Sequence, residues 1–441
     1  MKERRRTLVA LSVVVFSFAT HGCESDEAAT IPSSQAQPLG FGKADAPDLT
    51  ALPWDFPLEQ DLAILVPMEI EPPLEAGLPT EDGGVLLSAA WLGQVSDAYL
   101  ETDVMDALEV ENWYEEWQVV SVRVAPCGPL GNFPGHLPES ICWPQVRVVW
   151  EPVVEDHALF GFIPVDRYAD DRAVHALYRV QPTRDATELS WALEEVLAQI
   201  AADLPIEQLE PWVLDAFFEA RDLGISRLAY DVAALRSSSD EDSAWDVIDT
   251  RSEYYLNEDA AWTFHERLYG FLSHYAQPWA LHELTSFSLP EGRSPAVIDS
   301  WVFIAFDGEG GVITQKDITV RSRNTGELLV NLGSHQTVSG AGEDEAVLAA
   351  MEDPAVADEL AEHVFLANSD AQVFGDVIAD PTQTFVANTT CATCHRLTEL
   401  SFDFHTFSYF EDRDATISPR VIEDVDNDLR VLRTFLESVA P

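Results

Sequence analysis

The sequence predicts an α+β protein, with a β-rich N-terminal region, a helical middle and a short, mainly helical C-terminal segment. Three observations support this class. Apolar and polar residues alternate between 117 and 150, which is the period-2 pattern of strands. Apolar residues recur every three or four positions between 185 and 276, as in amphipathic helices. Strand-like runs return near residue 296 before a last helical pattern.

The 441-residue chain is long enough for several segments that each bury apolar side chains. Changes in composition divide it into a signal peptide (1–22), a tether (23–50), a β-rich region with a hairpin disulfide (51–180), a helical region (181–290), a β-hairpin region (291–342) and a C-terminal segment (343–441).

The N-terminus has the organisation of an export signal. A basic stretch from Lys2 to Arg6 precedes an apolar run from Leu8 to Ala19. Twelve helical residues span roughly 18 Å, less than a hydrocarbon core of ~30 Å, so the run favours a cleaved signal over a permanent span. It ends at Gly22-Cys23, which resembles the bacterial lipobox. The resemblance implies export to the periplasm or outer membrane with a lipid on Cys23; the alternative is ordinary cleavage nearby, with Cys23 free or removed.

The chain is strongly acidic. It has 77 acidic residues against 25 lysines and arginines, a formal charge of −52. Such a surface excludes nucleic acid as a partner and would be repelled by anionic lipid headgroups. The acidity is spread along the chain, so it indicates either a solvating surface or a docking face for a basic partner.

Five cysteines occur, an odd number for an exported protein. Cys127 and Cys142 flank a loop rich in glycine and proline and lie between two alternating apolar runs. We expect two half-buried strands forming a hairpin closed by a disulfide, which would add about 3 kcal/mol for a loop of this length. Two separate buried thiols are the alternative. Other strand candidates in this region are 61–70, 157–165 and 173–180.

Helices are expected at 185–204, 210–224, 226–236 and 259–276, with Gly224 as the C-cap of the second. The acidic serine stretch 237–243 is predicted to be a surface loop. His265, His274 and His282, together with Trp262 and Trp279, are interpreted as packing residues rather than catalytic ones.

The second β region begins with an apolar run at 296–306. The stretch 306–311 has the composition of a glycine-rich phosphate loop but is better interpreted as a hairpin turn. A further hairpin is predicted at 317–333, turning at 324–326. Neither the nucleophile-elbow motif nor the zinc-protease motif occurs in the sequence.

The most specific motif is Cys391-Ala392-Thr393-Cys394-His395. Two cysteines three residues apart on one helical turn can both reach the vinyl groups of one haem, and the next histidine can then ligate the iron. Chance occurrence in a chain of this composition is about 10⁻³. A zinc site would need a second ligand pair, and a thiol–disulfide motif would need a strand entering it. These two readings and an inert disulfide are the alternatives.

The segment therefore resembles the c-type cytochromes. The resemblance implies one covalent haem c, with thioether bonds to Cys391 and Cys394, an iron bond to His395, and electron transfer with a redox partner protein. His405, which lies among four phenylalanines, is the first candidate for the second iron ligand. Met351, His363 or an open position are the alternatives.

The surroundings of the motif are also predicted to be helical. Asp380 and Pro381 can start a helix that runs into the motif, and Ser418 and Pro419 can start a second one. In the family such a terminal helix packs across the motif helix. Gln383 and Ala387 stand where the family has an aromatic residue or a glycine. The second helix carries one apolar stripe, formed by Val421, Val425, Leu429, Leu432, Leu436 and Val439. It also carries three alternate aspartates, Asp424, Asp426 and Asp428. These loosely resemble a calcium-binding loop but lack the glycine and the glutamate that such a loop needs.

Two other functions remain open at this level. One is a haem enzyme or sensor with an open iron position, so catalysis is left undecided. The other is a haem-free envelope lipoprotein that acts as a binding or structural module.

Overall fold

In the computed structural model, all of the described residues belong to one compact unit, Leu39–Pro441. The structure describes residues 47–53, 56–68, 70, 72–100, 114–130, 141–157, 164–169, 172–180, 187–202, 204–236, 258–288, 301–316, 320–321, 328–329, 335–338, 407–410 and 413–439. The predicted signal peptide, the start of the tether and the stretch 237–243 lie outside these residues.

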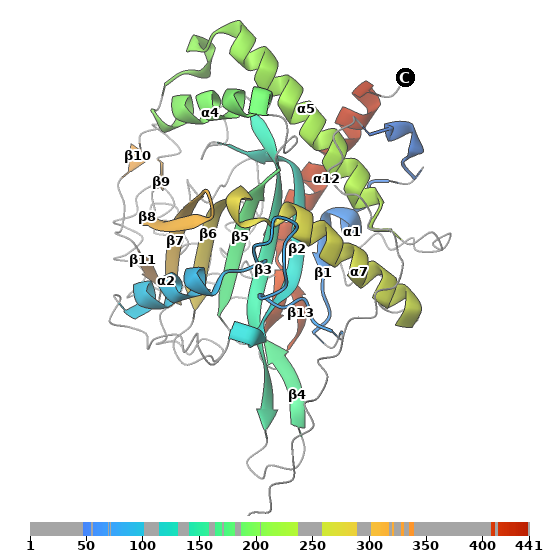
Figure 1. Cartoon of the computed structure of the whole chain (residues 1–441), viewed down its shortest axis with the longest axis vertical. Helices are drawn as coiled ribbons and strands as arrows, with labels where there is room; N and C mark the ends of the chain where they lie inside the picture. Colours follow the sequence, from blue (N-terminus) through green and yellow to red (C-terminus); the bar gives the residue numbers. More distant parts are fainter. Residues whose placement is uncertain are drawn as a thin grey trace, which may run out of the picture. The chain divides into compact units, whose positions relative to one another are not determined.

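An antiparallel sheet forms the centre of this unit (Figure 1). Its strand order is β1-β2-β3-β5-β6-β7-β11, and β4 and β8 add to β3 and β7. The strands are β1 (Ala63–Leu65), β2 (Trp117–Pro129), β3 (Cys142–His157), β4 (Pro164–Ala169), β5 (Ala173–Arg179), β6 (Leu281–Ser288), β7 (Trp301–Glu309), β8 (Val312–Lys316) and β11 (His335–Val338). Two short antiparallel pairs are separate from it: β9 (Val320–Arg321) with β10 (Leu328–Leu329), and β12 (Phe407–Phe410) with β13 (Arg413–Ile417).

Helices accompany the sheet, which confirms the α+β class. The α-helices are α1 (Glu59–Leu62), α2 (Ala89–Leu100), α4 (Thr187–Ala201), α5 (Pro211–Ala233), α7 (Glu258–Tyr275) and α12 (Pro419–Val439). The 3-10 helices are η1 (Leu49–Ala51), η2 (Tyr114–Glu116), η3 (Ile206–Gln208) and η4 (Pro278–Ala280). The predicted helices at 185–204 and 259–276 correspond to α4 and α7.

The predicted hairpin at 117–150 is confirmed, because β2 and β3 pair in antiparallel register. The prediction that these strands are half-buried is wrong. Neighbouring residues of a strand point to opposite faces, yet both Val122 and Arg123 of β2 are buried. Arg123 contacts Asp424 and Asp428 of α12. The polar face of the hairpin is therefore covered by the C-terminal helix.

The helix α5 lies on the face of the sheet opposite to α12. The prediction that Gly224 is a C-cap is wrong. A single helix runs through Gly224 and ends at Ala233. A Cβ atom at Gly224 would lie 2.8 Å from Cγ of Pro144 in β3, closer than side chains pack. Glycine is therefore present because the helix approaches the sheet closely, which only a residue without a side chain allows.

The turn predicted at 306–311 is confirmed between β7 and β8. Gly310 and Gly311 have φ angles of 58° and 86°, a region that residues with a side chain rarely adopt. The two glycines serve the backbone geometry of a tight hairpin, and β7 pairs with β8 on either side of them. Within the hairpin predicted at 317–333, β9 and β10 pair in antiparallel register, and the predicted turn at 324–326 lies outside the described residues.

Candidate functional site

The predicted haem site lies outside the described residues. This applies to Cys391, Cys394, His395 and His405, to the alternative ligands Met351 and His363, and to Cys23 at the predicted lipid anchor. These assignments stay predictions. The nearest described elements that follow the motif are β12, β13 and α12, and they establish where the chain after the motif is attached.

The helix α12 starts as the sequence predicts. The backbone N–H of Val421 donates a hydrogen bond to Oγ of Ser418 at 3.2 Å, which satisfies one of the free donors of the first turn. Pro419 is the first helical residue, where its missing N–H costs nothing. The apolar stripe is confirmed over most of its length, since Val425, Leu429 and Leu432 are buried against the main core.

A cluster of buried charges joins α12 to the sheet. Nη1 of Arg123 lies 3.2 Å from Oδ2 of Asp424, and Nη2 lies 2.9 Å from Oδ2 of Asp428. Nε of Arg420 lies 3.0 Å from the second oxygen of Asp424. The guanidinium of Arg123 on β2 thus binds the carboxylates of Asp424 and Asp428, which lie one helical turn apart. Because both carboxylates bind arginine, the structure gives no support to a calcium loop here.

Burial changes the ionisation of this cluster. It raises the pKa of Asp428 to about 7, and the negative charge of Asp424 adds to the increase, although Arg123 opposes it. Burial also lowers the pKa of Arg147, which faces Arg123 across the β2–β3 ladder, and the like charge of Arg123 adds to this shift. Burial therefore disfavours the charged forms of Asp428 and Arg147, whereas Arg123 favours the charged form of Asp428.

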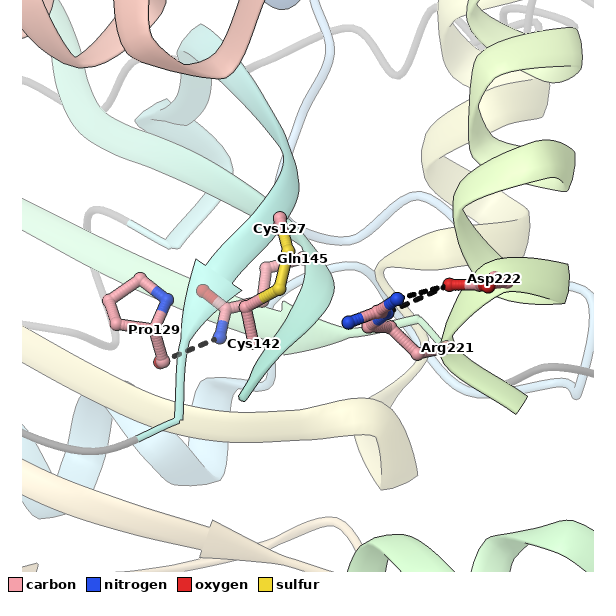
Figure 2. The surroundings of a disulfide bond; sticks show 6 residues. All are labelled: Cys127, Pro129, Cys142, Gln145, Arg221 and Asp222. Atoms are coloured by element: carbon pink, nitrogen blue, oxygen red, sulfur yellow. Dashed lines mark hydrogen bonds and ion pairs between the residues drawn. A yellow bond between two sulfur atoms is a disulfide. The ribbon is translucent and has the colours of Figure 1, made fainter. Parts of the chain in front are cut away.

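The disulfide predicted between Cys127 and Cys142 is present (Figure 2). The two Cα atoms are 5.0 Å apart and the residues are separated by 15 positions. Cys142 opens β3 directly opposite Pro129 of β2, where the ladder shifts register between Ala125 and Gly128. The bond therefore closes the neck of the hairpin at the point where regular pairing is interrupted.

Removing this disulfide should destabilise the protein by about 3 kcal/mol, the loop-closure entropy that a 15-residue loop regains in the unfolded chain. Urea unfolding of a Cys127→Ser/Cys142→Ser variant measures the difference. A reducing agent should lower the stability of the parent protein by a similar amount and leave that of the variant unchanged. Equal stability of parent and variant in oxidising buffer would contradict the prediction.

The three histidines of the helical region do not meet in one site. His265 is buried and its Nε2 lies 2.8 Å from the carbonyl oxygen of Pro72; burial lowers its pKa to about 4. His274 contacts Glu81 through Nδ1 at 2.9 Å. His282 contacts Arg179, and burial with this neighbouring positive charge lowers its pKa to about 3. Each has a separate structural partner, as the packing interpretation predicts.

The interpretation of Trp279 as a packing residue is wrong, because 39% of its surface is exposed. It follows Pro278 in the short helix η4, which turns the chain from α7 into β6 and places the ring at the surface.

Within the ranges that the structure describes, no group of three or more histidines, cysteines, aspartates or glutamates is placed to hold a metal ion. No helix in the described part of the chain combines the length and the apolar character needed to cross a membrane.

Comparisons with known proteins identify no relative. No family model matches the chain, and neither a curated protein nor a solved structure matches it significantly. Function therefore has to be argued from the residues themselves.

Proposed function

We propose that this protein is an exported, lipid-anchored, monohaem c-type cytochrome-like protein that transfers electrons. The observation that carries the proposal is the motif Cys391-Ala392-Thr393-Cys394-His395 in a chain whose first residues resemble a lipoprotein signal. The two features agree, because haem c is attached outside the cytoplasm. An anchor at Cys23 would hold the protein in the periplasm or at the outer membrane.

The residues of the motif would have different roles in haem binding. The sulfur atoms of Cys391 and Cys394 would hold the porphyrin, and Nε2 of His395 would ligate the iron. Bound haem supplies one-electron redox chemistry at the iron. His405 would be the second ligand, and two histidines generally favour a lower reduction potential than histidine with methionine.

The chain that follows the motif is attached to the body of the protein. Twelve residues after His395 the chain enters β12, which lies against β2 and β4. It then continues through β13 into α12, which is fixed to the sheet by the Arg123 cluster. A haem in this segment would thus be tethered to the body of the protein by its C-terminal side.

One observation favours a second candidate function. The sequence has no methionine after Met351, so the usual second ligand of small cytochromes c is missing downstream of the motif. If His405 does not bind the iron, the open position would suit a haem enzyme or a sensor of small ligands.

Haem attachment is testable on the full chain produced with a cytochrome c maturation system. We expect haem to stay on the polypeptide in a denaturing gel, and a pyridine haemochrome spectrum typical of two thioether bonds. A Cys391→Ser/Cys394→Ser variant should lose the haem. The matched control is Cys127→Ser/Cys142→Ser, which removes the other cysteine pair and should keep it.

The same material separates the alternatives. A low-spin spectrum that carbon monoxide does not change supports electron transfer, whereas a high-spin spectrum that shifts with carbon monoxide supports the open-site function. Colourless protein from the maturation system would overturn both haem functions and leave the haem-free lipoprotein.

A further inference from the structure

The helical hairpin of α4 and α5 is a distinct part of the fold. The two helices are joined through η3 and enclose a small core of their own. In it the rings of Trp143 from β3 and Phe217 from α5 lie with centroids 5.3 Å apart. Figure 1 shows the hairpin extending beyond one end of the sheet. This core stabilises the hairpin, so the residues on its outer surface are held in place.

Two tryptophans lie on the outside of this hairpin. The rings of Trp191 on α4 and Trp212 on α5 have centroids 4.9 Å apart and are tilted by 37°. Trp191 is half-buried, but 60% of Trp212 is exposed. Contact between the two rings accounts for only part of their surface. The two rings together form an exposed aromatic surface on an ordered hairpin, which a cation or an apolar group can contact.

The surface around the two rings is acidic. From residue 187 to 220 the sequence contains no lysine, arginine or histidine. Helical spacing places Glu195 on the same face as Trp191, and places Asp215 and Glu219 on the same face as Trp212. All three carboxylates are exposed. The rings are thus bordered by negative charge.

The same hairpin already contains a contact between a cationic side chain and an aromatic ring. Arg221 is the first basic residue after this stretch, and its guanidinium carbon lies 4.8 Å from the ring centroid of Phe218. Its Nη2 lies 2.6 Å from Oδ1 of Asp222. An aromatic ring with an adjacent carboxylate therefore already binds one guanidinium within this fold.

We propose that the surface formed by Trp191, Trp212, Glu195, Asp215 and Glu219 is a docking site for a lysine- or arginine-rich segment of a partner protein. The exposed ring of Trp212 offers a cation–π contact, and the carboxylates attract the same charge. The excess of negative charge over the whole chain would also draw a cationic partner from a distance. This proposal does not rest on haem binding.

Two other occupants fit the surface less well. A bilayer could accept a tryptophan, but anionic headgroups would repel the carboxylates that border it. A second copy of this chain would bring two strongly acidic surfaces together, at a formal charge of −52 on each.

The full chain can be tested with a defined probe, a hexapeptide of alternating arginine and lysine with blocked ends. We expect saturable binding in calorimetry that weakens as salt is added, since screening shortens the reach of surface charges. Trp212→Ala should weaken binding about fivefold, the equivalent of a cation–π contact worth about 1 kcal/mol. Asp215→Asn/Glu219→Gln, which keeps the ring, should also weaken it.

The matched control is Trp279→Ala, which removes another exposed tryptophan away from this hairpin and should leave the affinity unchanged. Equal affinity of the Trp212→Ala variant and the parent would overturn the proposal, because binding would then be general attraction to an acidic protein. Binding to phosphatidylglycerol vesicles that Trp212→Ala abolishes would instead assign the surface to lipid. A dimer that Trp212→Ala dissociates would assign it to self-association, and either result also overturns the proposal.

Discussion

Replacing Arg123 by alanine is expected to lower the free energy of unfolding by about 3–5 kcal/mol at pH 8, the cost of leaving the buried carboxylate of Asp428 without its partner. The side chains of Arg123 and Asp428 are 8% and 9% exposed, so water cannot replace the lost guanidinium. Urea unfolding at pH 8 and pH 5 measures the effect. The loss should be smaller at pH 5, because Asp428 can then take up a proton instead of staying charged.

The matched control for this substitution is Arg430→Ala. Arg430 is an exposed residue of α12, and its guanidinium donates a hydrogen bond to Oδ1 of Asn427 within the same helix. Its removal should change stability by less than ~0.5 kcal/mol, as for most surface substitutions. If the two alanine variants have the same stability, the cluster does not fix α12 to the sheet. Hydrogen exchange in α12 should also increase in the Arg123 variant before the rest of the sheet is affected.

The buried charges explain why the β2–β3 hairpin is not a simple half-exposed pair. An arginine between valines gives the strand the period-2 pattern of a surface strand. That pattern predicts the strand correctly, but it cannot show that α12 covers the polar side, because the partner aspartates are about 300 residues away in the chain. Long-range pairing of this kind leaves no local signal.

Several elements could be predicted because their signals are local. Helix α12 follows from the capping residue Ser418, the proline after it and the apolar stripe. The β7–β8 hairpin follows from its glycines. The C-cap predicted at Gly224 is wrong because the deciding contact is not local. Glycine ends many helices, and only the position of Pro144 shows that here it permits close packing.

Strand β6 was missed because its exposure does not alternate. Leu281 and Leu284 are buried three residues apart, and both Ser286 and Phe287 are buried. The spacing of Leu281 and Leu284 arises from a register shift between β5 and β6 at Tyr178, so the period-2 pattern of a strand is broken there. The strand therefore merged with the predicted helical region 181–290.

The candidate sites differ in how they could be found. The haem motif is a short sequence pattern and needs no structure to be proposed. The Arg123 cluster and the surface around Trp212 depend on which side chains come together and how exposed they are. The sequence offered one usable hint for the second, a long stretch without basic residues around two tryptophans.

Replacing Asp428 by asparagine is expected to stabilise the protein at neutral pH and to remove part of its pH dependence. The pKa of Asp428 is raised from 3.8 to about 7, so between these values the folded chain keeps a proton that the unfolded chain releases. Stability therefore falls as pH rises through this window, by up to ~1.4 kcal/mol per pH unit from this group. Asparagine does not titrate and still offers an oxygen to Arg123.

Chemical unfolding of parent and variant at pH 4.5, 6 and 8 tests this expectation. The gain from asparagine should be small at the lowest pH, should grow up to about pH 7 and should then level off. Other charges face the same position, namely Arg123, Asp424 and Arg147, so the matched comparison is Asp426→Asn, an exposed aspartate of the same helix. That variant should change the free energy of unfolding by less than ~0.5 kcal/mol, as most surface substitutions do. A gain that is constant from pH 4.5 to 8 for Asp428→Asn would mean that this carboxylate is ionised throughout, and that Arg123 outweighs the effect of burial.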